Sequence, residues 1–232
     1  MPQLSVIIPT LNEAENLNVL LPYLQRILDS TSFEIIVADG GSEDETVQMA
    51  QAYEVTVIQS PRGRAKQLNV GANAARGTYL YFLHADTTPP LTLLEHLKWI
   101  KRQMVPAACF RLKFQSTHGL LRFLAWWTRV DFNCFRYGDQ SLLVARDHFQ
   151  RVGGYDEKLH LLEDNDLVVR LKQVGPFMIL PDYVLTSARK YERYGVFYLQ
   201  AVYTLIYLLA QLGVEQKKLL HIYRRALRSN MD

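Results

Sequence analysis

Short apolar runs and helical segments alternate through the first ninety residues of this chain. The apolar runs have the length and composition of buried strands. The segments between them have helical features, such as the leucines on one face of residues 13–28. Because parallel strands need a crossover helix, this alternation predicts an α/β fold with a parallel sheet covered on both faces. The predicted strands are residues 4–8, 33–38, 55–58 and 79–83, and the predicted helices are residues 13–28, a helix opened by Ser42, Asp44 and Glu45, and residues 66–75.

The pattern becomes less regular after Pro90. Apolar stretches there are shorter, and strand and helix no longer alternate evenly. We find no internal repeat and no low-complexity linker in this half. The expected elements are a helix at 91–104, an extended segment at 108–114, an apolar and aromatic segment at 120–130, a strand at 141–145, a short helix at 147–152 and a helix at 162–174.

Composition limits the kinds of partner and compartment. A net charge of +3 in 232 residues is too small to indicate nucleic acid as a partner. Cys109 and Cys134 form neither a disulfide framework nor a CxxC metal pattern, which favours a reducing compartment. No charged segment followed by an apolar one precedes the first strand, so no secretory signal is predicted. We therefore expect a cytoplasmic location.

Acidic residues follow two of the predicted strands. Asp39 closes the run 33–38, and Asp86 comes shortly after the run 79–83. In an open α/β sheet, the carboxyl ends of the strands form the edge where ligands bind. A third acidic site lies at the start of a later predicted helix, in Glu163-Asp164-Asn165-Asp166. Three such carboxylate sites suit a general base, a metal site and a proton transfer.

Several motifs stand in an order that is typical of one enzyme family. They are Ser5-Val6-Ile7-Ile8-Pro9-Thr10-Leu11-Asn12-Glu13, Val37-Ala38-Asp39-Gly40-Gly41-Ser42, Leu83-His84-Ala85-Asp86, Gly138-Asp139-Gln140, Gly153-Gly154-Tyr155, and Glu163-Asp164-Asn165-Asp166-Leu167 followed by Arg170. Their order resembles that of the family 2 glycosyltransferases of GT-A fold, and the resemblance covers about the first 190 residues. It depends on the motifs together, because each of them is weak alone.

The resemblance implies a GT-A (Rossmann-like), mostly parallel sheet flanked by helices over residues 1–190. Residues 1–90 would form its nucleotide-binding half and residues 91–190 its acceptor-side half, with a C-terminal helical extension at 191–232. It also implies an inverting glycosyltransferase that moves a sugar from a nucleotide-diphosphate donor, UDP- or GDP-linked, to an acceptor hydroxyl. The QxxRW motif of processive members is absent, which disfavours a polymerising synthase.

The donor nucleotide is expected at the edge of the first strands. Asp39 is suited to bind the base or ribose, and its alternative role is that of a turn or helix-capping residue. Cations after the third strand are suited to the diphosphate, and their alternative is a solvated loop. Arg189, together with Lys190 and Arg193, is expected to close over the diphosphate as a lid. The predicted donor-binding residues are Pro9, Thr10, Glu13, Asp39, Gly40, Arg64, Lys66 and Arg189.

Asp86 and His84 occupy the place of the family's DxD metal motif. A hard cation such as Mn²⁺ or Mg²⁺ prefers carboxylate and phosphate oxygens, so Asp86 is the predicted ligand. His84 replaces the first acid of the motif. It either ligates the metal, or has a structural role or a hydrogen bond to phosphate.

Asp164 is the predicted general base, because transfer with inversion needs one carboxylate to deprotonate the acceptor hydroxyl. Glu163 and Asp166 are the alternative bases. The structural alternative for this cluster is capping of a helix whose N-terminus favours negative charge. The resemblance places Asp164 at the family's catalytic position.

On the acceptor side, the resemblance points to Gly138, Asp139 and Gln140. Trp126 and Trp127 are assigned there as well, with a role in the core as their alternative. The apolar middle and tail of the chain would suit a lipophilic acceptor, but this rests on analogy with similar proteins. The acceptor itself is not identified by the sequence.

Residues 196–214 are apolar and contain no charge. They have three interpretations: a helix packed in the core or forming a homodimer, a helix lying in a membrane interface, and a membrane span. Basic residues flank the segment on both sides, and the tail from 217 to 228 is basic and has no acid. Such a tail suits an anionic membrane surface or a solvated helix face. Peripheral contact with the inner face of the membrane is therefore expected under the second interpretation.

Two other classes of function remain as alternatives. A sugar-nucleotide nucleotidyltransferase shares the strand–helix core, but a glycine-rich loop is missing after the first strand. A non-catalytic nucleotide-sugar-binding protein need not keep a base, whereas Asp39, Asp86 and Asp164 are all present. A dinucleotide oxidoreductase is disfavoured because no GxGxxG follows Ile8.

Overall fold

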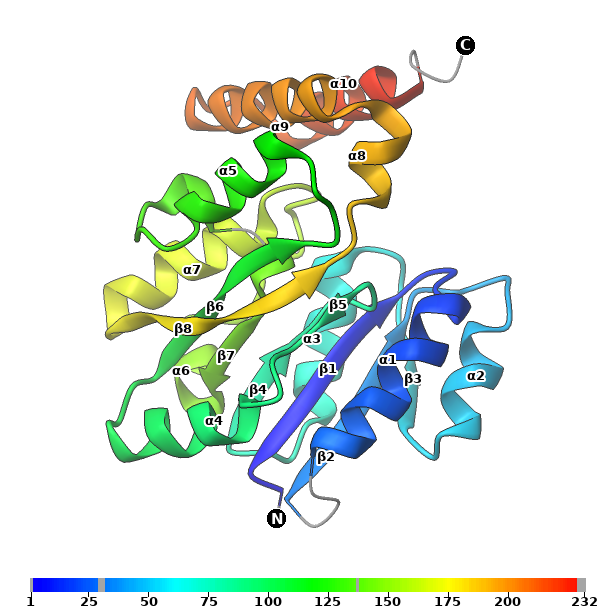
Figure 1. The fold of residues 1–232 in the computed structure, drawn as a ribbon, viewed down its shortest axis with the longest axis vertical. Helices are drawn as coiled ribbons and strands as arrows, with labels where there is room; N and C mark the ends of the chain where they lie inside the picture. Colours follow the sequence, from blue (N-terminus) through cyan, green and yellow to red (C-terminus); the bar gives the residue numbers. More distant parts are fainter. Residues whose placement is uncertain (1, 29–31, 137, 229–232) are drawn as a thin grey trace.

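An eight-stranded sheet runs through the centre of the protein, in the order β3-β2-β1-β4-β7-β6-β8-β5 (Figure 1). The structure is a computed structural model that describes residues 2–28, 32–136 and 138–228. The predicted regions 1–90, 91–190 and 191–232 also include residues 1, 29–31, 137 and 229–232. These residues lie outside the described residues. The strands are β1 (Leu4–Thr10), β2 (Phe33–Asp39), β3 (Thr56–Gln59), β4 (Tyr79–Phe82), β5 (Thr87–Thr88), β6 (Ala107–Phe114), β7 (Leu142–Ala145) and β8 (Phe177–Thr186).

Strands β1 to β4 form one parallel part of the sheet. β1 pairs in parallel with β2 and with β4, and β2 pairs in parallel with β3. The strand β7 joins this part to β6 through antiparallel pairs, and β6 and β8 are parallel again. The predicted α/β fold with a mostly parallel sheet is therefore confirmed.

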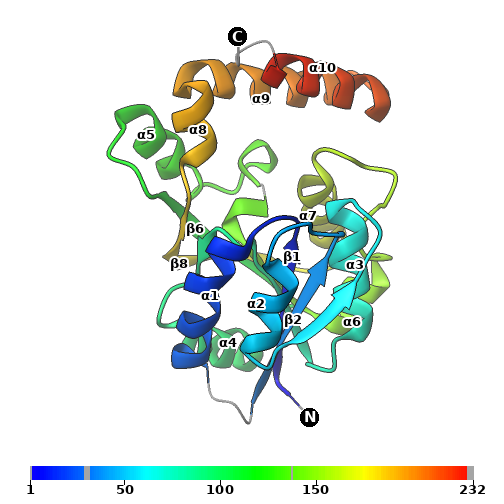
Figure 2. The same ribbon diagram turned by 90° about the vertical axis from the view of Figure 1, so that its right-hand side faces the viewer.

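Helices cover both faces of the sheet (Figures 1 and 2). Helices α1, α2 and α4 lie on one face, and helices α3, α6 and α7 lie on the other. Figure 1 shows α9 and α10 side by side across the top of the molecule, with α5 beneath them. The helices are α1 (Ala14–Ile27), α2 (Thr46–Ala52), α3 (Arg64–Ala74), α4 (Leu93–Arg102), α5 (Gly119–Trp127), α6 (Arg146–Arg151), α7 (Glu163–Val174), α8 (Arg189–Tyr194), α9 (Val196–Gln211) and α10 (Gln216–Arg228), with 3₁₀ turns η1 (Asn133–Phe135) and η2 (Gly138–Gln140).

The central strand β1 is buried on both faces, which explains its continuous apolar run. Val6 and Ile8 pack into the core under α1 and α4, whereas Ile7 packs into the core under α3 and α7. This alternation follows from the two-residue period of a strand. Gly71 in α3 permits close packing on β1, because a Cβ atom there would meet the side chain of Ile7 at 2.5 Å.

The C-terminal helices form a small cluster of their own around Val202, Ile206 and Leu219. The helix that forms in the apolar segment 196–214 is shorter than the segment itself. This helix, α9, ends at Gln211, and a turn containing Gly213 follows it. The basic tail forms α10, which packs against α9. Among the residues that the structure describes, no helix is long and apolar enough to cross a membrane.

Candidate active site

A cavity of about 740 Å³ opens at the carboxyl-end edge of the sheet, between the sheet and helices α9 and α10. Residues from both halves of the chain line it. Its sheet side includes the loop after β1 and the segment after β4, and its far side is formed by α9 and Tyr223 of α10. The predicted site residues that line it are Pro9, Thr10, Glu13, Arg64, His84, Asp86, Gly138, Asp139, Gln140, Glu163, Asp164 and Arg189.

The loop after β1 is fixed by hydrogen bonds to its neighbours. The Gly40 amide donates to the Thr10 carbonyl at 2.9 Å. The Gln67 side-chain amide from α3 donates to the same carbonyl at 2.6 Å and to the Ala38 carbonyl at 2.9 Å. Gln67 is buried and also lines the cavity, and it ties the ends of β1 and β2 together.

Asp39 lies at this edge, but its carboxylate is buried and is not part of the cavity lining. One oxygen accepts hydrogen bonds from the Gly41 and Ser42 amides, both at 2.9 Å. The other accepts from the hydroxyls of Thr10 and Ser42. In this structure Asp39 therefore has the turn-forming role that was the alternative in the sequence analysis. Contact between Asp39 and a nucleoside stays a prediction.

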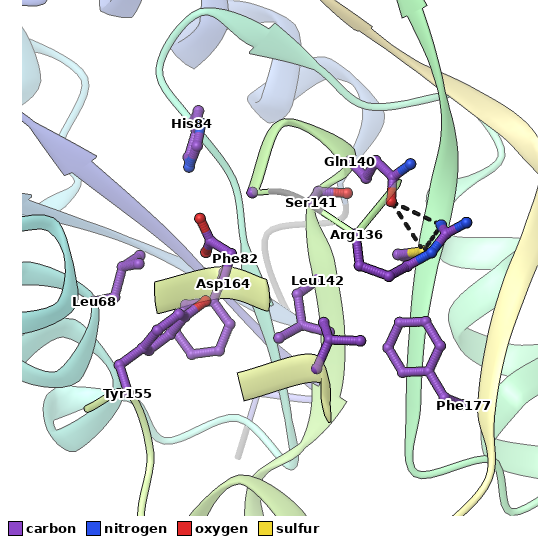
Figure 3. Close-up of a pocket in the computed structure, with 13 residues that line it drawn as sticks. Leu68, Phe82, His84, Arg136, Gln140, Ser141, Leu142, Tyr155, Asp164 and Phe177 are labelled. Carbon is purple, nitrogen blue, oxygen red and sulfur yellow. Dashed lines mark hydrogen bonds between the residues drawn. The ribbon is translucent and has the colours of Figure 1, made fainter. Parts of the chain in front are cut away.

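Asp164 faces the cavity from the first turn of α7, and its side chain is 15% exposed. Figure 3 shows a small recess beside the cavity, in which the Asp164 carboxylate points toward His84 and the ring of Tyr155 lies below it. Gly138 makes room for this arrangement, because a Cβ atom there would collide with the Asp164 carboxylate and would lie 2.8 Å from the His84 ring. Burial, with the charge of Asp164 beside it, raises the pKa of the Tyr155 hydroxyl well above its ordinary value.

Arg64 links the donor side of the cavity to the acidic cluster. Its Nε atom contacts Glu163 at 2.9 Å, and its Nη1 atom lies 3.5 Å from Asp164 and 3.4 Å from the Nε2 atom of His84. Glu163 is buried, and this burial raises the pKa of its carboxyl above the ordinary value, although the Arg64 charge opposes the shift. The charge of Glu163 raises the pKa of Arg64 in turn. Arg64 therefore stays charged beside two carboxylates.

Asp166 lies outside the cavity lining. Its Oδ2 atom accepts from the Arg170 guanidinium at 2.6 Å and 2.8 Å. Arg170 also donates to the carbonyls of Val152 and Gly154, at 2.6 Å and 2.7 Å. Asp166 thus helps to anchor α7 to the Gly153-Gly154 turn, and of the three acids in the cluster it is the one that the structure does not bring to the cavity.

Asp86 and His84 lie close together, but each has a partner in the protein. Asp86 is 3.4 Å from the Arg189 guanidinium, which also contacts Glu13 at 2.7 Å and 3.0 Å. His84 Nδ1 lies 3.3 Å from Asp139. Desolvation opposes ionisation of Asp139, but the hydrogen bond and charge of His84, helped by Lys190 and Arg64, lower its pKa to about 2.

The described residues contain no group of three or more His, Cys, Asp and Glu side chains arranged around a metal position. Mg²⁺ in nucleotide sites is usually held by one or two carboxylates together with substrate phosphates, rather than by a cage of protein ligands. Asp86 therefore fits as a single carboxylate ligand. His84 lies next to it, although its Nδ1 atom is directed to Asp139.

Four other predicted residues lie outside the cavity lining. Gly40 is buried beside Gln67, and Lys66 lies in α3 one residue before Gln67. Trp126 is half exposed, and Trp127 stacks on Phe135 at 5.8 Å between ring centroids. Helix α5 instead lines the cavity through Leu124 and, just past its end, Thr128.

The sequence analysis does not assign the tyrosines that line the far wall of the cavity. Tyr203 of α9 stacks on Tyr223 of α10, with ring centroids 6.2 Å apart, and meets Tyr191 edge-on at 6.1 Å. Tyr207 follows one helical turn after Tyr203 and lines the cavity too. The four-residue spacing of Tyr203 and Tyr207 in an uncharged helix was the only feature of the sequence that could have indicated a shared tyrosine face. The contact with Tyr223 depends on the packing of two helices.

The fold resembles that of two solved glycosyltransferases. A mannosyltransferase from Pyrobaculum calidifontis matches with a TM-score of 0.71 and 18% identity over 98% of this chain and 74% of that chain. S. aureus TarS matches with a TM-score of 0.69 and 21% identity over 87% of this chain and 39% of that chain. This likeness concerns the fold, and it confirms the predicted GT-A architecture.

The chain belongs to glycosyl transferase family 2, whose sequence profile matches residues 5–150. An uncharacterized glycosyltransferase of Haemophilus influenzae is 27% identical over an alignment of 187 residues, which covers 75% of this chain and 63% of the relative. Glycosyltransferase AglE of Haloferax volcanii is 30% identical over 110 residues, which make up 44% of this chain and 34% of the relative. The match thus spans less than two thirds of the length of either relative.

Proposed function

We propose that the protein is an inverting glycosyltransferase that moves a sugar from a nucleotide-diphosphate donor to an acceptor hydroxyl. The observation that carries the proposal is the place of Asp164. It faces the cavity, next to His84 and Arg64 and across from the loop after β1. Membership of glycosyl transferase family 2 supports the same reaction class.

Asp164 is the proposed base. The acceptor hydroxyl gives its proton to an Oδ atom of Asp164, and the acceptor oxygen attacks the anomeric carbon opposite the diphosphate. The bond from that carbon to the diphosphate oxygen then breaks, so the configuration inverts. Glu163 is less suited because it is buried against Arg64, and Asp166 is less suited because it is paired with Arg170. Arg64 lies between the two carboxylates, with its Nη1 atom 3.5 Å from Asp164.

The donor diphosphate is proposed to lie among Arg64, Arg189 and Lys190, which are cationic groups that line the cavity. Pro9, Thr10 and Glu13 would then face the nucleoside. Among solved structures with this fold, TarS has been determined with UDP and with UDP-GlcNAc, and the Pyrobaculum mannosyltransferase with GDP-Man and Mn²⁺. These complexes support a UDP- or GDP-linked donor here.

Asp86, with His84 beside it, would hold Mn²⁺ or Mg²⁺. When bound there, the metal would neutralise charge on the leaving diphosphate. Arg189 lies against Asp86 and contributes positive charge at the same place. The Mn²⁺ in the Pyrobaculum complex supports this assignment.

The acceptor is proposed to be lipophilic at the end away from its reacting hydroxyl. Leu112, Phe114, Leu124 and Ile206 give the cavity an apolar part of its lining. Gly138, Asp139 and Gln140 also line the cavity, and Gly138 lies against Asp164. A cytoplasmic location and the division into residues 1–90, 91–190 and 191–232 stay predictions.

A turnover assay with UDP- and GDP-linked sugars and Mn²⁺ tests the proposal. We expect release of a nucleoside diphosphate and appearance of a glycosylated acceptor. In a parallel assay with a nucleoside triphosphate and a sugar 1-phosphate, release of pyrophosphate would show a nucleotidyltransferase instead. A donor that raises the melting temperature but is never consumed would show a nucleotide-sugar-binding protein.

A further inference from the structure

Helix α9 carries an apolar stripe on its outer side. Phe197, Leu205, Leu208 and Leu212 are 73%, 47%, 54% and 79% exposed, and Ala201 between them is exposed as well. Their spacing of four, four, three and four residues follows the helical period, so they share one face of α9 and its C-terminal turn. We call these five residues the α9 stripe.

The other faces of α9 are already used within the protein. Leu199, Val202 and Ile206 are buried, and α10 packs along the helix. The Tyr203 side faces the cavity. The α9 stripe is therefore an exposed face of a helix whose other faces are packed against the protein or line the cavity.

Aromatic residues on and after α5 form a second exposed group. Phe123, Trp126 and Phe132 are 57%, 50% and 54% exposed. Their rings connect through Trp127 and Phe135, with centroid separations of 5.3 to 6.5 Å. We call these five residues the α5 ridge. Just before α5, the ring of His118 lies 6.0 Å from the ring of Phe197 in the α9 stripe.

Basic residues lie beside the α5 ridge and on α10 next to α9, and one exposed acid, Asp131, directly precedes Phe132. Arg122 and Arg129 are exposed beside the α5 ridge. The exposed bases Lys217, Lys218, Arg224 and Arg225 lie on α10, about one helix diameter, ~10 Å, from α9. None of α5, α9 and α10 contains an acidic residue.

The charge distribution distinguishes between two kinds of partner. In a twofold dimer each subunit presents the same patch, so the basic rim would face another basic rim. An anionic lipid surface presents the opposite charge, and it attracts basic residues that lie within a Debye length, ~10 Å. Trp and Phe side chains are also suited to the boundary between headgroups and acyl chains.

We propose that the α9 stripe and the α5 ridge together dock on a bilayer that contains anionic lipids, with both helices lying in its interface. The proposal adds α5 to the expected membrane contact of the C-terminal segment. It does not depend on glycosyl transfer. Because α5 and α9 also line the cavity from their inner sides, docking would bring the cavity next to the lipid surface.

Co-sedimentation with phosphatidylcholine vesicles, with and without phosphatidylglycerol, tests the proposal. We expect the protein to bind the vesicles with phosphatidylglycerol and to be released by high salt. Leu208→Glu and Phe123→Glu should each weaken binding by about tenfold or more, because each places a negative charge in the contact. Val19→Glu and Met104→Glu change residues that are 69% and 84% exposed elsewhere, and should leave binding unchanged.

A second measurement does not require loss of binding. Trp126 becomes the sole tryptophan in the double variant Trp99→Phe and Trp127→Phe, and brominated lipids should then quench its fluorescence.

The proposal is overturned if the protein does not bind vesicles, or if the patch and control variants bind equally. It is also overturned if light scattering shows a dimer that Leu208→Glu converts to a monomer, since the surface would then join two copies.

Discussion

Arg64 joins the side of the cavity that is proposed for the donor to the carboxylates Glu163 and Asp164. The sequence analysis assigned it to the diphosphate, because it follows the third strand among other cations. Its contact with Glu163 could not be predicted, since the two residues are far apart in the sequence and meet only through the packing of α3 and α7. The structure therefore gives Arg64 a second partner on the acceptor side.

Arg64→Gln should lower the free energy of unfolding by about 1–3 kcal/mol at neutral pH. The cost is below that of breaking a fully buried pair because the Arg64 side chain is 42% exposed. Burial already raises the pKa of Glu163, and loss of the cation raises it further. As the pH falls through that raised pKa, Glu163 becomes neutral in the folded protein and the difference from wild type should shrink. Urea unfolding at neutral and acidic pH measures this, and an equal difference at both pH values would contradict the account.

Asp39 shows that the position of a residue at a strand end does not determine its partner. The residue lies where expected, but its carboxylate is turned into the Gly40-Gly41 turn by backbone amides. Which of the two roles it takes depends on the direction of the side chain, and sequence pattern does not contain that direction.

Asp39→Ala should lower the free energy of unfolding by about 1–3 kcal/mol, because two partly buried amides lose their charged acceptor. Glu43→Ala is a matched control, since Glu43 lies in the same loop with its side chain 84% exposed. Thermal unfolding of the two variants measures the effect. Unchanged stability together with weaker nucleotide binding would favour the nucleoside-binding role instead.

At the scale of elements, the first half of the sheet was predictable and part of the second half was not. Strands β1, β2 and β4 are largely buried, and strands β1 to β4 alternate in sequence with helices, so their local pattern is strong. Strand β5 has only two residues and exists through pairing with β8, where the hydroxyls of Thr87 and Thr186 are 2.9 Å apart. Such long-range pairing leaves little signal in the sequence.

The 3₁₀ turn η2 leaves room for the carboxylate of Asp164, the proposed base, because Gly138 has no side chain. Gly138→Ala should reduce kcat by about 100-fold, because a Cβ atom would displace the Asp164 carboxylate from its productive position. Gly119→Ala is the control, since a Cβ atom at Gly119 meets nothing within 4 Å. Steady-state kinetics and donor titration of both variants measure the effect. Unchanged turnover in Gly138→Ala would show that Asp164 tolerates displacement.

At the scale of the whole molecule, the cavity lies between the sheet edge and the C-terminal helices. Most residues on the sheet side of the cavity could be predicted from the sequence, because they belong to motifs at the ends of strands. It did not predict the wall formed by Tyr203, Tyr207 and Tyr223, since that wall depends on how α9 and α10 fold back over the sheet.

Donor binding should depend on metal through Asp86. Asp86→Ala should abolish the enhancement of donor binding by Mn²⁺, and His84→Ala should reduce it less, because Nδ1 of His84 is directed to Asp139. Calorimetric titration of the donor with Mn²⁺ and with a chelator measures both effects. Equal affinity in the presence of chelator would show that Arg189, Arg64 and Lys190 alone hold the diphosphate.

The central claim is that Asp164 removes the acceptor proton in a single-displacement transfer. A base acts in the transition state more than in donor binding, so its loss should affect kcat rather than donor affinity. The most direct measurement is kcat of Asp164→Asn beside its dissociation constant for the donor. We expect donor affinity to be kept while kcat falls by about 10²–10⁴-fold. Wild-type turnover in Asp164→Asn would contradict the account.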